Sequence, residues 1–204
     1  MPRLSAVLAV SLVLLGMVVG AAIAGSGRQT VTLTETRQVL TTLTVTRPVT
    51  ATVLADTDVS VRAVCFSKTA NCASVIIDLI NRANRSVLVA IFSFTRDDIA
   101  AALIRAKNRG VEVRVVMERE RANESGSEYR RLRDNRVDVR LDGNSDLMHH
   151  KFIVVDERLV ITGSYNFSVA AEDRNDENVV VILSERVADR YRSEFERVWS
   201  LASP

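Results

Sequence analysis

Both histidines of the 204-residue chain stand side by side in the stretch MHHKFIVVD, residues 148–156, and a lysine follows them. Side chains alternate faces along a strand, so we expect His149 and Lys151 on one side and His150 on the other. Two diverging imidazoles cannot readily close on one metal ion, and an ammonium group beside the first would repel a cation. The pair instead suits a phosphodiester: Lys151 can bind a non-bridging oxygen while His149 attacks phosphorus.

Further polar residues follow this stretch along the chain. Ser164 and Asn166, in the sequence GSYNF, offer a hydroxyl and an amide for contacts with phosphate oxygens. Glu177 could accept the Nδ1 proton of an imidazole and so fix its tautomer. A plain turn serine and an exposed carboxylate at a strand end are the alternatives for Ser164 and Glu177. Asp156 is an odd number of positions from His149, so its side chain is expected on the opposite face of the strand. It also ends the predicted strand, which favours a turn or scaffold role.

The spacing of these residues resembles a known signature. The pattern HxKxxxxD followed by GSxN is that of the phospholipase D superfamily, and here it falls on His149, Lys151, Asp156, Gly163, Ser164 and Asn166. The form HHKFIVVD…ITGSYNFSVAAEDRNDEN most resembles the small single-motif members of that superfamily, the bacterial Nuc-type endonucleases. The resemblance extends loosely from about Val64 to Trp199.

The resemblance implies a reaction through a covalent phosphohistidine, without a metal ion or other cofactor. It implies that His149 is the nucleophile, that Lys151 and Asn166 bind phosphate oxygens with Ser164 in support, and that Glu177 orients the imidazole. These residues and Asp156 form the expected catalytic set, in which the role of Asp156 is largely structural.

The resemblance also implies a homodimer. Members of the superfamily use two motifs per active site, with one histidine attacking phosphorus and the other protonating the leaving oxygen. This chain has no third histidine with which to build a second motif. A two-fold dimer would bring His149 of each subunit to one shared site.

The resemblance to Nuc-type endonucleases implies nucleic acid as the substrate, and a membrane phospholipid is the alternative. Five arginines that could follow a phosphate backbone lie close together: Arg130, Arg131, Arg133, Arg136 and Arg140. Asp134 and Asp138 interrupt them, and such a stretch is more often a solvated helix and strand. The net charge of +2 arises from residues 1–57, which hold four arginines and two acidic residues, so the rest of the chain is neutral and lacks the global basicity of many nucleic-acid-binding proteins.

Two remoter functions are a non-catalytic anchored binding module and a metallohydrolase that uses His149 and His150. A binding module that has lost activity would be expected to lose His149 or Lys151. A metallohydrolase would need further histidine or cysteine ligands at suitable spacing, which the sequence lacks.

Alternating strand-like and helix-like segments must position these residues. Strands are expected at residues 61–66, 86–94, 111–117, 137–141, 152–155, 159–162 and 177–183, and helices at residues 74–85, 97–108, 127–134 and from 185 onward. Strands separated by helices predict an α/β fold, and the resemblance implies the α/β/α sandwich with a mixed sheet of phospholipase D-like proteins.

The N-terminal region predicts export. Residues 4–24 form an apolar run that is long enough to span a bilayer and ends in a small-x-small pattern, so residues 1–28 are expected to be a signal peptide or a membrane anchor. Residues 29–57 are rich in threonine and are expected to be an extended stalk, with a hairpin packed on the domain as the alternative. Residues 58–204 form the predicted catalytic domain, located outside the cytoplasm and either anchored to the membrane or secreted.

Two cysteines, Cys65 and Cys72, enclose the sequence CFSKTANC at the start of this domain. In an exported protein such a pair suggests a small disulfide loop, and two buried free thiols are the alternative.

Overall fold

A computed structural model describes residues 8–14, 17–23, 30–38, 44–52 and 59–204. The chain divides into two compact units, Met1–Thr57 and Asp58–Pro204. In the first unit, strands β1 (Leu8–Leu14) and β2 (Met17–Ile23) pair antiparallel, as do β3 (Thr30–Gln38) and β4 (Thr44–Thr52).

The predictions for residues 1–57 fall partly outside the described residues. Among the described helices, none has both the length and the apolar character needed to cross a membrane. The signal peptide or anchor over residues 1–28 and the threonine-rich stalk over residues 29–57 therefore stay predictions.

A seven-stranded mixed sheet forms the centre of the second unit. Its strands lie in the order β5 (Ser60–Phe66), β11 (Asn178–Leu183), β10 (Leu159–Gly163), β9 (Lys151–Val155), β6 (Ser86–Ile91), β7 (Glu112–Met117) and β8 (Asp138–Leu141). The strands β6, β7 and β8 run parallel to one another, and every other neighbouring pair is antiparallel. The predicted α/β fold with a mixed sheet is confirmed.

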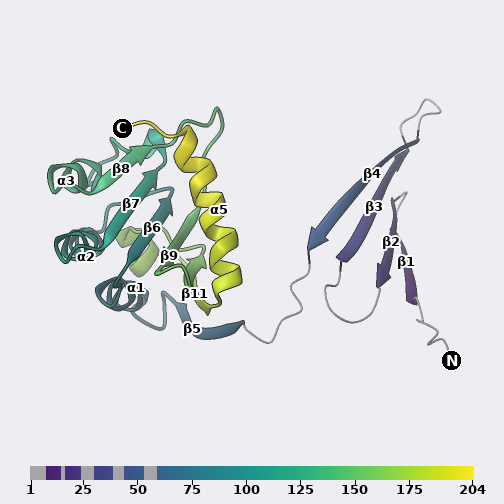
Figure 1. Cartoon of the computed structure of the whole chain (residues 1–204), viewed down its shortest axis with the longest axis horizontal. Coiled ribbons are helices and arrows are strands. Elements are labelled where there is room, and N and C mark those ends of the chain that lie inside the picture. The colour runs from purple at the N-terminus through teal and green to yellow at the C-terminus, as the bar shows by residue number, and fades with distance from the viewer. Residues whose placement is uncertain (1–7, 15–16, 24–29, 39–43, 53–58) are drawn as a thin grey trace. The chain divides into compact units, whose positions relative to one another are not determined.

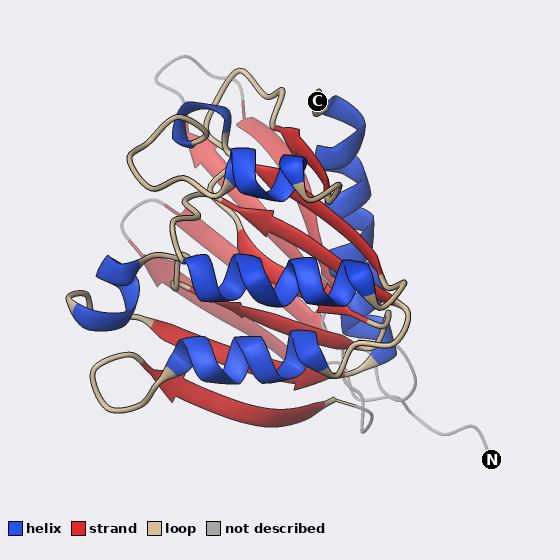
Figure 2. Ribbon diagram, turned by 90° about the vertical axis from the view of Figure 1, so that its left-hand side faces the viewer, coloured by secondary structure: helices blue, strands red, loops and turns tan. Residues whose placement is uncertain are grey.

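Helices cover both faces of this sheet (Figures 1 and 2). One face carries α1 (Cys72–Asn81), α2 (Asp97–Asn108) and α3 (Tyr129–Asp134), and the other carries α5 (Glu185–Leu201). The short helices η1 (Arg119–Arg121) and α4 (Val169–Asp173) were not expected from the sequence. Both have few residues, so hydrophobic periodicity cannot reveal them.

Strand β6 shows how the sequence builds the two layers, because all six of its residues are buried. Val87 and Val89 pack into the core beneath α1 and α2, whereas Leu88 and Ala90 pack into the core beneath α5. The strand is therefore apolar throughout, since it has no face exposed to water. Full burial of each large apolar side chain contributes roughly 1.5–3 kcal/mol to the stability of the fold. This burial stabilises the sheet that carries the site.

Strand direction gathers the polar segments at one end of the sheet. Strand β9 runs antiparallel to β6, with Lys151 opposite Ile91, so the chain leaves β6 where it enters β9. Strand β10 ends beside the start of β11, with Gly163 opposite Val179. The segments that precede β9 and β11, and those that follow β6, β7 and β10, therefore meet at this end.

The predicted disulfide between Cys65 and Cys72 is present, with the two Cα atoms 5.7 Å apart. It joins the end of β5 to the first residue of α1. Both cysteines are buried in the core beneath α1.

Candidate active site

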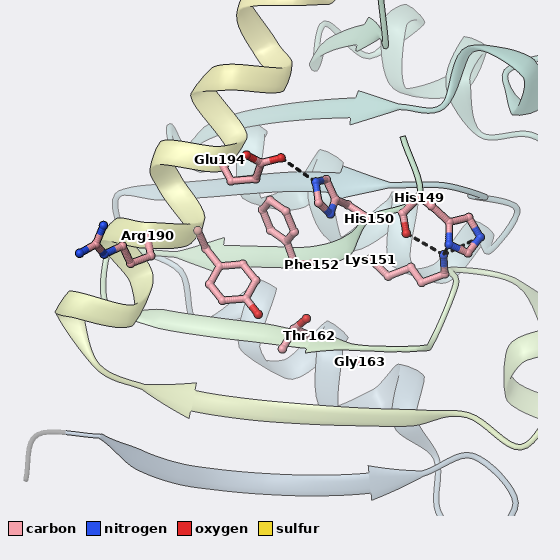
Figure 3. A pocket seen from close by; sticks show the side chains of 9 residues that line it. His149, His150, Lys151, Phe152, Thr162, Gly163, Arg190 and Glu194 are labelled. Carbon is pink, nitrogen blue, oxygen red and sulfur yellow. Dashed lines mark hydrogen bonds and ion pairs between the residues drawn. The ribbon is translucent and has the colours of Figure 1, made fainter. Parts of the chain in front are cut away.

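The two histidines diverge at the start of β9 (Figure 3). The strand begins at Lys151, so both imidazoles belong to the segment that enters it. Nζ of Lys151 lies 3.2 Å from Nδ1 and 3.3 Å from Nε2 of His149. Nε2 of His150 lies 2.8 Å from Oε1 of Glu194 on α5. The structure thus brings His149 and Lys151 together and directs His150 to the opposite side of the sheet.

The environment of His149 favours the neutral imidazole. Burial lowers its pKa, and the charges of Lys151 and Arg121 lower it further. The pKa of Lys151 is also lowered, by burial, against an opposing effect of Glu177. A neutral imidazole keeps a lone pair with which to attack phosphorus, and the ammonium group remains a donor for an anionic substrate.

An aromatic side chain packs against His149 and Lys151. The ring of Phe92, the first residue after β6, lies 4.4 Å from the ring of His149 between centroids. The ammonium of Lys151 and the guanidinium of Arg121 lie 5.0 Å and 4.8 Å from the Phe92 centroid. These are cation–π distances, so one ring contacts His149 and two cations. The sequence reasoning missed Phe92 and Arg121, because nothing in their local pattern indicates contact with His149.

A buried carboxylate fixes the segment just before His149. Glu118 follows β7 directly and is only 3% exposed. Its Oε2 accepts a 2.6 Å hydrogen bond from the backbone N–H of Met148, and its Oε1 accepts one from the N–H of Glu120 at 3.3 Å. Its negative charge raises the pKa of His149, against the cations. Glu118 was not identified from the sequence. The signal that could have revealed it is a charged residue directly after a buried strand.

Ser164 joins the end of β10 to the start of β11. Its Oγ accepts hydrogen bonds from the backbone N–H and the Nδ2 of Asn178, at 3.1 and 3.3 Å. The backbones approach so closely here that a Cβ on Gly163, where φ is +153°, would lie 2.1 Å from the carbonyl oxygen of Asn178. Only glycine therefore fits at position 163, and Ser164 holds the loop that carries Asn166.

Asn166 presents an amide that can donate to a substrate. Its Oδ1 accepts a 3.3 Å hydrogen bond from the backbone N–H of Ser93, which follows β6. Its Nδ2 makes no hydrogen bond to any residue that the structure describes. Because the oxygen is held by Ser93, the NH₂ group is the end available for a phosphate oxygen.

Glu177 does not contact His149 within the described part of this chain. Its Oε1 accepts a 3.0 Å hydrogen bond from Nδ2 of Asn175, and its backbone N–H donates to Oγ of Ser67 at 3.0 Å. Its charge acts on the pKa of Lys151 rather than on that of His149. One chain alone therefore does not form the expected contact that would orient the imidazole.

Asp156 lies beyond the far end of β9 from His149. Its carboxylate accepts hydrogen bonds from the backbone N–H groups of Asn84, Arg85 and Ser86, the shortest at 2.8 Å from Arg85. Its own backbone has a φ of +51°, a conformation that aspartate tolerates better than most residues. The side chain therefore joins the end of β9 to the start of β6, away from the reacting atoms.

No group of three histidine, cysteine, aspartate or glutamate side chains in the described ranges is arranged to hold a metal ion. The groups at this site whose charge or free donors suit a phosphate are the cations Lys151 and Arg121 and the amide of Asn166.

Comparison with known families agrees with this geometry. A family model described as the cardiolipin synthase, PLD-like domain, matches residues 76–199, which is more than half of the chain. The chain belongs to the phospholipase D superfamily. The resemblance seen in the sequence is thereby confirmed, and the match contains every residue of the expected catalytic set.

Two curated relatives show how far the similarity reaches. The mitochondrial cardiolipin hydrolase of Xenopus tropicalis is 40% identical over 126 residues, which are 62% of this chain and 60% of that protein. The phospholipase D of Rickettsia prowazekii is 35% identical over 127 residues, 62% of each chain. The chain therefore spans about three fifths of the length of the curated relatives that it matches.

Solved structures share the fold. The phospholipase D family member Nuc from Salmonella typhimurium has a TM-score of 0.67 and 32% identity, and the match covers 71% of this chain and 97% of Nuc. NucT from Helicobacter pylori has a TM-score of 0.64 at 23% identity, which shows a common fold alone.

Proposed function

We propose that residues 58–204 hydrolyse phosphodiester bonds of nucleic acid without a metal ion, through a covalent phosphohistidine at His149. The observation that carries this proposal is the contact between the ammonium of Lys151 and the imidazole of His149, whose lowered pKa keeps it neutral near pH 7. A nucleophile next to a fixed cation matches an anionic electrophile.

The reaction has two steps. In the first, the neutral imidazole of His149 attacks phosphorus, the bond to the leaving oxygen breaks, and a second, protonated imidazole gives that oxygen its proton. In the second, the same second imidazole takes a proton from water, the resulting hydroxide attacks phosphorus, and the bond to His149 breaks. Lys151 and the amide of Asn166 bind the non-bridging oxygens, where negative charge accumulates in both steps.

The second imidazole comes from another copy of the chain. His150 is held by Glu194 on the opposite side of the sheet, so one chain supplies a single available imidazole. An uncovered apolar surface on strand β5 supports such a dimer, because Val64 and Phe66 are 55% and 57% exposed. They alternate with the buried Cys65, so they lie on the sheet face that carries α5. Phe66 pairs with Asn178, at the same end of the sheet as the site.

The substrate assignment rests on the resemblance to Nuc-type endonucleases, the similarity to Nuc, and the cations Lys151 and Arg121 beside the nucleophile. A phospholipid is the second candidate, since relatives are named phospholipase D and cardiolipin hydrolase. Leu147 and Val169, which are 53% and 48% exposed near the site end of the sheet, also favour lipid contact. The apolar residues 4–24 support a location outside the cytoplasm, anchored or secreted.

Incubation with single-stranded DNA, duplex DNA, RNA, and vesicles of phosphatidylcholine or cardiolipin, all in EDTA, tests the proposal. We expect nucleic-acid cleavage that persists in EDTA and disappears in His149→Ala. The exposed variant Glu157→Gln, at the far end of the sheet from the site, serves as the matched control. Hydrolysis of lipid alone would contradict the substrate assignment, and complete loss of activity in EDTA that zinc restores would contradict the metal-independent chemistry.

A further inference from the structure

A cavity of about 390 Å³ opens beside the catalytic pair, between the sheet and α5 (Figure 3). His149 and Lys151 line one end of it. Six further side chains line the cavity and come from β9, β10, α5 and the segment that enters β9: His150, Phe152, Thr162, Arg190, Tyr191 and Glu194.

One wall of the cavity is held in place by charge. Glu194 accepts hydrogen bonds from Nε and Nη2 of Arg197 at 2.9 and 2.7 Å, and it lies 2.8 Å from Nε2 of His150. The hydrogen bond from Arg197, followed by that from His150, lowers the pKa of Glu194 to about 2. The carboxylate is therefore charged at neutral pH, and it holds the imidazole of His150 in place at the wall of the cavity.

The middle of the cavity combines aromatic surface with free hydroxyl groups. The rings of Phe152 and Tyr191 lie edge to face, 5.0 Å apart between centroids. The hydroxyls of Thr162 and Tyr191 make no hydrogen bond within residues 59–204. Arg190, at the outer rim, likewise has no ion-pair partner among these residues. The cavity thus offers an aromatic surface, two unpaired hydroxyls and a free cation, in addition to Lys151.

We infer that this cavity is a subsite for the nucleoside that adjoins the scissile phosphate. The sugar oxygens bond to the hydroxyls of Thr162 and Tyr191, the base lies against the aromatic side chains, and Arg190 meets the next phosphate along the strand. A glycerol group could use the hydroxyls but has no ring to match the aromatic surface, so the lining favours a nucleoside. The inference rests on the proposed function and specifies which residues select the substrate.

Two small chromogenic substrates separate the subsite from the chemistry. Bis(p-nitrophenyl) phosphate carries no nucleoside, whereas the p-nitrophenyl ester of thymidine monophosphate carries one. In Tyr191→Phe and Thr162→Val, which lose a hydroxyl and keep the shape, we expect kcat/KM to fall about fivefold to tenfold for the thymidine ester. The rate for bis(p-nitrophenyl) phosphate should not change. Arg192→Gln, on the same helix but paired with Asp189, is the control for both substrates.

Arg190 is tested with a longer substrate, because the thymidine ester has no second phosphate. With a short oligothymidylate, we expect Arg190→Gln to lower kcat/KM about fivefold to tenfold and Arg192→Gln to leave it unchanged. Circular-dichroism melting checks that each variant of the full chain is folded.

The results of these assays separate the proposed function from the proposed subsite. If the wild-type protein hydrolyses neither chromogenic ester, the proposed function fails and the subsite fails with it. If it hydrolyses both and the variants match the wild type, the subsite alone is overturned. If the variants slow hydrolysis of cardiolipin vesicles and not of the thymidine ester, the cavity binds a lipid headgroup and the nucleoside assignment is wrong.

Discussion

Nζ of Lys151 lies 3.2 Å from Nδ1 of His149, and the same ammonium donates a 3.0 Å hydrogen bond to the carbonyl oxygen of His149. The ammonium group of Lys151 is therefore held by the ring and the backbone carbonyl of His149 without a substrate. A phosphate oxygen bound to this ammonium group would lie directly beside the imidazole of His149. This relationship links the pKa of His149 to the presence of Lys151.

The pH dependence of kcat/KM should be bell-shaped, because one imidazole must start neutral and the other protonated. The lowered pKa of His149 places the acidic limb below the ordinary histidine value of 6.5. Replacement of Lys151 by methionine removes a positive charge and should raise the pKa of His149, which an NMR titration of the imidazole would report. A flat profile from about pH 5 to 9 with chemistry limiting would contradict this division of roles.

Glu118→Gln should shift the acidic limb of the kcat/KM profile to lower pH, which is opposite to the effect of replacing Lys151. The amide oxygen of glutamine can still accept the hydrogen bond from Met148, but the negative charge that raises the pKa of His149 is lost. We expect the pKa of His149 to fall and the acidic limb to move to lower pH. Glu120→Gln, an exposed neighbour, should leave the profile in place. An unchanged limb in Glu118→Gln would show that the carboxylate has only a structural role.

Asp156→Asn should lower stability. Burial raises the pKa of Asp156, but backbone donors from Arg85, Ser86 and Asn84 outweigh that effect, so the pKa is lowered. A carboxylate with a lowered folded-state pKa stabilises the fold above its unfolded value of about 4, and this contribution disappears as the pH falls through the folded value. At pH 7 we expect a loss of about 1–3 kcal/mol in the free energy of unfolding.

Denaturant unfolding of Asp156→Asn at pH 7 and at about pH 3 would check this expectation. The difference from the wild type should shrink at the lower pH, where the wild-type carboxylate begins to protonate. Glu157→Gln is the matched control, because Glu157 also has a positive φ but forms only an exposed ion pair with Arg85. Equal stability of Asp156→Asn and the wild type at pH 7 would refute the scaffold role.

Reduction of the disulfide should lower the melting temperature without altering the site. Cys65 and Cys72 close a short loop, for which the chain-entropy argument gives about 2.5 kcal/mol. Calorimetry with and without a reductant, and of the double variant Cys65→Ser with Cys72→Ser, would measure the loss. If the reductant lowers the melting temperature of the double variant as much as that of the wild type, the effect does not arise from this bond.

Mixed dimers test the shared site. If one site needs His149 from both subunits, a dimer of one wild-type and one His149→Ala chain is inactive. Activity in co-refolded mixtures should then fall as the square of the wild-type fraction. A linear fall would show that each chain has an independent site.

The sequence predicted the fold class and the position of most strands, because hydrophobic pattern decides both. It extended the strand that begins at Ser86 as far as Phe94, although β6 ends at Ile91. Two of the three extra residues are aromatic, but Phe94 forms an isolated bridge with Phe167, and the N–H of Thr95 donates to the carbonyl of Phe167. Such pairing with a distant loop leaves no local signal.

The site residues that belong to a motif of fixed spacing could be predicted from the sequence. The residues that reach the site only through tertiary contacts could not. Strand parity was sufficient to separate His149 and Lys151 from His150. The contacts of Phe92, Glu118 and Arg121 with this segment join residues far apart in the chain, so no spacing rule could reveal them.

Detection of the covalent intermediate tests the central claim most directly. The protein would be mixed rapidly with an oligonucleotide substrate, denatured at alkaline pH to preserve phosphohistidine, digested and analysed by mass spectrometry. We predict a nucleotidyl adduct, joined through a phosphorus–nitrogen bond, on the peptide that contains MHHKFIVVD, assigned by fragmentation to His149, retained in His150→Ala and absent in His149→Ala. An adduct on His150, or an active enzyme that forms its adduct in His149→Ala, would contradict the account.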